Sequence, residues 1–141
     1  MGSTSGCLAG FRDCFACASL LTLLYVRSLT RTTEFYDAVF GWPKSVAVPT
    51  YTEYEVEANA FLGFMEQSRT ETFLGDAVRG LAQPELQNAE VYLRVEDVHE
   101  VERRLLEQGA TCLSALAPRS WGESVAYFRD PDGFVLAIAP R

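Results

Sequence analysis

The sequence has few basic residues and almost no histidine. Its 141 residues include 12 Lys and Arg against 19 Asp and Glu, a formal net charge of −7, and His99 is the single histidine. An acidic surface offers no long-range attraction to phosphates or anionic lipids. We therefore expect neither nucleic acid nor a membrane as a partner. Low-complexity tracts are also missing, which with 48% hydrophobic residues predicts a folded core.

A clear targeting segment is missing as well. Residues 14–26 are apolar, but Asp13 precedes them and Arg12 is the only basic residue before them, which matches a secretory signal poorly. The four cysteines include the pair Cys14 and Cys17, which has no second ligand pair and no strand-to-helix setting. These features predict reduced thiols in a cytoplasmic protein.

Apolar patterning divides the chain into two similar halves, each with one strand, one helix and three further strands. In the first half the predicted elements are strand 20–27, helix 30–40 and strands 45–48, 53–57 and 60–66. In the second half they are strand 90–96, helix 98–108 and strands 110–116, 124–128 and 134–138. Ser28 or Thr30 can cap the first helix and Asp97 the second, and Gly41 and Gly109 can end them.

The two halves also align residue by residue. Residues 22–29 match residues 91–98 at an offset of 69 residues (95 − 26), and Phe35 and Tyr36 of the first helix are assigned to its packing against the sheet. The polar stretch between the halves has room for at most one short helix. The prediction is an α+β protein with these parts: a flexible leader at 1–18, a first β-α-β-β-β module at 19–68, a linker at 69–88 and a second module at 89–141.

The closing hairpin is the most distinctive stretch. Asp130-Pro131-Asp132-Gly133 forms a tight turn, because Pro presets φ and Gly accepts a positive φ, and both flanks are apolar and β-prone. With the preceding Trp121-Gly122, the helix Glu34–Trp42 and the Val95–Val98 segment, it resembles the vicinal oxygen chelate superfamily. That superfamily includes glyoxalase I, bleomycin-resistance proteins and extradiol dioxygenases. The resemblance runs from about Leu20 to the C-terminus.

The resemblance implies two β-α-β-β-β modules whose sheets curl around a shared cleft, commonly in a dimer. It also implies a divalent metal held by His, Gln or Glu at four positions, which correspond here to Leu21, Gly63, Glu90 and Ala137. Only Glu90 can coordinate; Glu66 is the one acid near Gly63, and His99 is assigned to the helix surface. A single carboxylate does not hold a catalytic divalent ion. We therefore expect no metal and no cofactor.

Period-two alternation along the strands indicates which side chains face the cleft. If Glu90 faces it, Tyr92 and Arg94 share its side, and the intervening apolar residues face the helix. The predicted ligand-binding set is Leu21, Leu23, Tyr25, Phe61, Met65, Glu90, Tyr92, Arg94, Trp121 and Ala137. An apolar wall with a few polar groups is typical of small-molecule sites. The alternatives are that these side chains close a packed core and that Glu90 pairs with Arg94.

Two functions are compatible with these residues. The first is a metal-free homodimer that binds a small molecule, because the resemblance to bleomycin-resistance proteins implies sequestration and an acidic surface favours a cationic ligand. The second is a glyoxalase-like lyase, an isomerase or a dioxygenase, with Glu90 as the residue able to act as a general base. A regulatory or accessory subunit is a third possibility. Fold alone does not choose among them.

Overall fold

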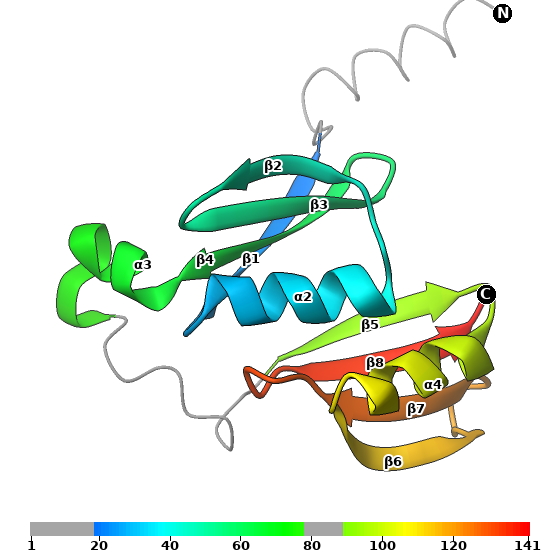
Figure 1. Ribbon diagram of the computed structural model, residues 1–141. Helices are drawn as coiled ribbons and strands as arrows, with labels where there is room; N and C mark the ends of the chain where they lie inside the picture. Colours follow the sequence, from blue (N-terminus) through cyan, green and yellow to red (C-terminus); the bar gives the residue numbers. More distant parts are fainter. Residues whose placement is uncertain (1–18, 78–88) are drawn as a thin grey trace, which may run out of the picture.

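The computed structural model describes residues 19–77 and 89–141 and contains two β-α-β-β-β modules (Figure 1). The first comprises β1 (Leu20–Val26), α2 (Leu29–Val39), β2 (Lys44–Val48), β3 (Tyr51–Glu57) and β4 (Ala60–Glu66), followed by the short helices α3 (Gln67–Leu74) and η1 (Gly75–Ala77). The second comprises β5 (Glu90–Val95), α4 (Val98–Glu107), β6 (Thr111–Pro118), β7 (Ser124–Arg129) and β8 (Val135–Pro140). None of these helices is long and apolar enough to cross a bilayer.

Each module forms one four-stranded mixed sheet, which confirms the predicted α+β class. The strand orders are β1-β4-β3-β2 and β5-β8-β7-β6, with β1 parallel to β4 and β5 parallel to β8. β1 and β5 are thus edge strands in equivalent places. No curling of the sheets is seen in the described part of the chain. The predicted leader and most of the predicted linker lie outside the described residues.

The helix ends follow the local signals in the sequence. The Ser28 hydroxyl accepts a hydrogen bond from the Arg31 backbone N–H, and the Asp97 carboxylate accepts one from the Glu100 N–H at 3.1 Å. Both caps satisfy a backbone donor that the first helical turn leaves unpaired. After each helix the chain reverses at a glycine with positive φ, 64° at Gly41 and 86° at Gly109.

The two modules share one hydrophobic core, in which α2 lies between the two sheets (Figure 1). Tyr36 and Val39 of α2, Leu105 of α4, Phe64 of β4 and Ile138 of β8 are all completely buried within it. The sheet faces that carry the helices therefore look toward each other. The opposite face of each sheet, which we call its open face, looks away from this core.

The turn between β7 and β8 docks onto α2 through one buried and one partly buried hydrogen bond. The Tyr36 hydroxyl donates to the Asp130 carboxylate at 2.7 Å, and the Thr32 hydroxyl donates to Asp132 at 2.7 Å. Asp130 also accepts the backbone N–H groups of Asp132 and Phe134 at 2.9 and 2.8 Å. Burial is the main reason that the Asp130 carboxyl has its pKa raised to about 6. We call Tyr36, Thr32, Asp130 and Asp132 the module latch.

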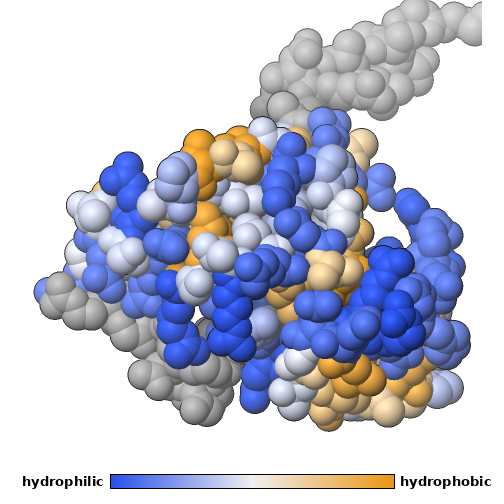
Figure 2. All heavy atoms as spheres, in the orientation of Figure 1, coloured by the Kyte–Doolittle hydropathy of each residue, from blue (hydrophilic) through white to orange (hydrophobic). Residues whose placement is uncertain are grey.

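Hydrophilic side chains dominate the surface seen in Figure 2, whereas hydrophobic ones gather over β2 and β6. Val48 on β2 is 50% exposed and Leu113 on β6 is 42% exposed. Both strands are the outer strands of their sheets, far in strand order from β1 and β5. These apolar areas therefore lie at the edges of the two sheets opposite to β1 and β5.

Candidate functional site

The open face of the second sheet carries its own small cluster of side chains. Val125 and Ala137 pack there with Tyr92 and Tyr127, whereas Leu93 belongs to the main core on the helix side. Adjacent residues of β5 thus point to opposite faces, as alternation requires. Ala137 is completely buried in this cluster, so it is not open to a ligand in this structure.

Glu123 organises a polar group on this open face. It accepts the Tyr92 hydroxyl at 2.7 Å and the Arg94 Nε at 2.7 Å, and the Arg94 Nη2 at 3.2 Å. The Trp121 indole N–H donates to the Tyr92 hydroxyl at 3.4 Å, and the Arg94 guanidinium lies 5.1 Å from the centre of the Tyr92 ring. Tyr92, Arg94, Trp121 and Glu123 form what we call the Glu123 cluster.

The structure thereby excludes the pairing of Arg94 with Glu90, because the partner of Arg94 is Glu123. Hydrogen bonds from Arg94, and then from Tyr92, lower the pKa of the Glu123 carboxyl, so it stays charged at a lower pH than an unpaired Glu does. Sequence reasoning missed Glu123 because the residue lies before β7, where strand alternation does not apply. Gly122, with φ of 98°, turns the chain just ahead of it.

A cavity of about 270 Å³ lies at the boundary of the modules, between β1 and β4 on one side and β5 on the other. Three residues of the predicted set line it: Phe61, Glu90 and Tyr92. Its other lining residues are Leu20, Thr22, Val56, Ala60, Leu62, Val91 and Leu93. Its volume is close to the lower end, roughly 300 Å³, of typical ligand pockets. We call it the boundary recess.

Glu90 is exposed at the recess, and its side chain makes no hydrogen bond or ion pair with any described residue. It therefore carries an uncompensated negative charge beside an apolar wall. A general base is normally oriented by a second group, and residues 19–77 and 89–141 supply none to Glu90.

The remaining predicted residues lie on the open face of the first sheet. The strand register pairs Leu21 with Phe61, Leu23 with Gly63, and Tyr25 with Met65. Leu21 is 42% exposed, and Leu23, Tyr25 and Met65 are half-buried. The structure thus groups them on one wall, apart from the Glu123 cluster.

Tyr51 and Glu53 also belong to this wall, although sequence reasoning did not select them. The Tyr51 hydroxyl donates to Glu53 at 2.5 Å and lies over Gly63, where a Cβ atom would come within 2.8 Å of it. Ser45 donates to the same carboxylate at 2.7 Å. The sequence predicts a strand that begins at Glu53, two residues after the actual start of β3, so Tyr51 falls outside the predicted strand.

The four positions that correspond to the superfamily's metal ligands do not fit a divalent ion. Gly63 pairs with Leu23 and Ala137 pairs with Tyr92, so these two positions are equivalent at the 69-residue offset (92 − 23). Neither they nor Leu21 offer a donor atom, and Glu90 stands alone. Within the described ranges no three His, Cys, Asp or Glu side chains converge as a metal site requires.

Comparison with known proteins places this geometry in context. The sequence matches the glyoxalase-like domain family over residues 20–140. A glyoxalase-related enzyme from Fulvimarina pelagi superimposes with a TM-score of 0.76 at 22% identity, covering 90% of this chain and 89% of that one. A glyoxalase/bleomycin resistance protein/dioxygenase family enzyme from Burkholderia phytofirmans PsJN superimposes with a TM-score of 0.72 at 18% identity, covering 85% of this chain and 95% of that one.

The bleomycin resistance determinant encoded on the transposon Tn5 gives a TM-score of 0.62 at 20% identity, covering 89% of this chain and 98% of that one. No curated protein sequence matches. Structural likeness at these identities establishes the fold, and the family match extends over both modules. The chain therefore belongs to the glyoxalase-like domain family of the glyoxalase/bleomycin resistance/dioxygenase superfamily.

Proposed function

We propose that the protein binds a small apolar or cationic molecule at the boundary recess, beside the Glu123 cluster, and that it does so without a metal. The observation that supports this most directly is the free carboxylate of Glu90 at an apolar cavity that both modules line. Phe61 and Tyr92 supply aromatic surface there. Arg94 is neutralised by Glu123, so the charge offered to a ligand is negative.

Glu90→Gln should weaken the binding of a cationic aromatic probe, 4-biphenylmethylammonium, by ~1–3 kcal/mol, the usual range for losing a charge-assisted hydrogen bond. The chain has two tryptophans, so in a Trp42→Phe background all tryptophan fluorescence comes from Trp121. Trp121 donates to Tyr92, which lines the recess. Titration of the fluorescence would give the Kd of each variant.

Glu34→Gln is the matched control, because Glu34 is exposed on α2, away from the recess. It removes the same charge from the protein and should leave the Kd unchanged. Glu90→Gln should also leave the free energy of unfolding within about 0.5 kcal/mol, as surface substitutions usually do. If both variants weakened binding of the probe equally, the effect would come from the net charge of the protein and not from Glu90 at the recess. If Glu90→Gln did not weaken binding, Glu90 would have no part in the proposed site.

The proposal includes a homodimer in which β1 lies at the subunit contact. Leu20 is 63% exposed and Leu21 is 42% exposed on this edge strand, and such adjacent apolar residues favour association. Leu21→Glu should shift sedimentation velocity profiles from dimer to monomer at micromolar concentration. Leu106→Glu, at a 56% exposed position of α4, should not. A monomeric starting protein would contradict this part of the proposal.

A further inference from the structure

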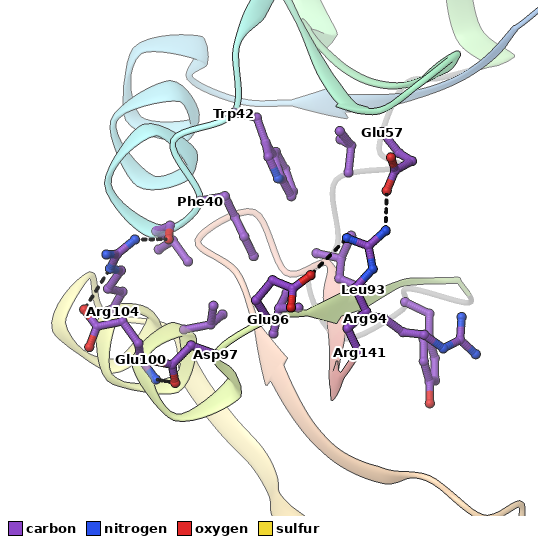
Figure 3. Close-up of a pocket in the computed structure, with 15 residues that line it drawn as sticks. Phe40, Trp42, Glu57, Leu93, Arg94, Glu96, Asp97, Glu100, Arg104 and Arg141 are labelled. Carbon is purple, nitrogen blue, oxygen red and sulfur yellow. Dashed lines mark hydrogen bonds and ion pairs between the residues drawn. The ribbon is translucent and has the colours of Figure 1, made fainter.

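A second and larger cavity, of about 810 Å³, lies between the modules on the helix side of β5 (Figure 3). It shares only Val56, Tyr92 and Leu93 with the boundary recess. Its volume falls within the range of roughly 300–1,000 Å³ that is typical of ligand pockets. We call it the helix-side groove, and the proposed function does not use it.

The groove has an aromatic wall and an aliphatic floor. Phe40 and Trp42 project into it from the first module, and their rings stack 4.3 Å apart at an angle of 8° (Figure 3). Leu93, Val95 and Val101 of the second module line it as well. Both aromatic rings are only partly buried, so apolar surface remains open to a flat ligand.

The charged groups of the groove do not balance. It is lined by four carboxylates and three guanidinium groups, from Glu57, Glu96, Asp97 and Glu100 and from Arg94, Arg104 and Arg141. All three guanidinium groups are already engaged. Arg94 is paired with Glu123 at 2.7 Å, and Arg104 is paired with Glu100 at 3.0 Å.

Arg141 bridges the two modules, with Glu57 at 3.2 Å on one side and Glu96 at 3.1 Å on the other (Figure 3). Asp97 is consequently the one carboxylate of the groove that has no cationic partner among the described residues. One of its oxygens caps α4 through the Glu100 N–H. The groove therefore combines an aromatic wall with one carboxylate that no cationic side chain of the described residues pairs.

We infer that the helix-side groove binds amphipathic cations, with a flat apolar body against Phe40 and Trp42 and one positive group near Asp97. The carboxylates that outnumber the guanidinium groups disfavour an anion, since each added negative charge would compete for an arginine that is already paired. A cation completes the charge balance without breaking any ion pair between the modules.

The test uses a Trp121→Phe background, in which Trp42 is the only tryptophan and its fluorescence reports the groove. Three probes of one shape differ in charge: 4-biphenylmethylammonium, 4-biphenylmethanol and 4-biphenylacetate. The cation should change Trp42 emission at the lowest concentration and the anion at the highest. Equal affinity for all three probes, or no change of Trp42 emission with the cation, would overturn the inference.

Asp97→Asn removes the charge and keeps the helix cap, because Asn caps helices as well as Asp does. It should weaken the cation about 3- to 5-fold, the effect of a partly exposed charge pair, and leave the neutral probe unchanged. Val101→Phe should block the groove, whereas Leu106→Phe on the exposed side of α4 should not. If Asp97→Asn leaves the preference for the cation intact, Asp97 is not its anchor and the inference fails.

The two proposals fail separately. In the Trp42→Phe background, a response of Trp121 that is sensitive to Glu90→Gln supports the boundary recess, whatever Trp42 does in the Trp121→Phe background. If Trp121 alone responds, the groove is overturned and the proposed function stands. If Trp42 alone responds, the inference about the helix-side groove stands and the proposed function is overturned.

Discussion

Tyr36→Ala should lower the free energy of unfolding by ~3–5 kcal/mol, the range for removing a fully buried large aromatic side chain. Tyr36 has no exposed surface, and its ring centre lies 4.4 Å from that of Phe64 and 5.1 Å from that of Phe35. The substitution leaves a cavity in the core that both modules share. Urea unfolding followed by circular dichroism would measure the loss.

Tyr36→Phe separates the hydroxyl from the ring. It keeps the packing and removes only the hydrogen bond to Asp130, so it should cost ~1–3 kcal/mol, the penalty for a buried acceptor that loses a donor. If Tyr36→Phe lowered the free energy of unfolding as much as Tyr36→Ala, the hydrogen bond to Asp130, and not the packing of the ring, would account for most of the contribution of Tyr36 to stability. No loss at all would show that water or another donor replaces the hydroxyl.

Asp130→Asn should flatten the dependence of stability on pH between about pH 4 and pH 6. The pKa of the Asp130 carboxyl is raised from 3.8 to about 6 in the folded protein, mainly by burial. The folded state therefore holds a proton that the unfolded state releases across this interval. The stabilisation from this proton is complete below pH 4 and is lost as the pH rises through 6.

The change for this one group is about 3 kcal/mol, since one pKa unit corresponds to about 1.4 kcal/mol. Unfolding of the native sequence and of Asp130→Asn should be compared at pH 4.5 and pH 7, because other carboxyls titrate equally in both proteins. One of these carboxyls is Glu100, whose pKa is lowered to about 2 by hydrogen bonds from Arg103 and Arg104. Its contribution to stability is lost as the pH falls, whereas that of Asp130 is lost as the pH rises. Parallel pH profiles for the two proteins would contradict the prediction.

The module latch bears on function because both cavities are built from the two modules together. The boundary recess lies between β1, β4 and β5, and the helix-side groove lies between α2, β3, β5 and α4. Any change in how the turn at Asp130 docks on α2 would alter both. Binding and stability measurements on the latch variants should therefore be made on the same preparations.

The sequence by itself determined the class of the fold. Caps at Ser28 and Asp97, the positive-φ glycines at Gly41 and Gly109 and the turn after Asp130 are local signals, which depend on residues within a few positions of each other. Strand alternation likewise placed Tyr92 on the face opposite Leu93, because the period of a strand is a local property. The 69-residue repeat then predicted two equivalent sheets.

Only the tertiary structure decided which side chains meet. Tyr36 reaches Asp130 across 94 residues, and Tyr92 reaches Glu123 across 31, from a strand to a loop where no periodicity operates. The groove beside Asp97 exists because α2 packs between two sheets, an arrangement that no segment encodes alone. Contacts between distant segments depend on how whole modules dock, whereas local patterns report only the conformation of each segment.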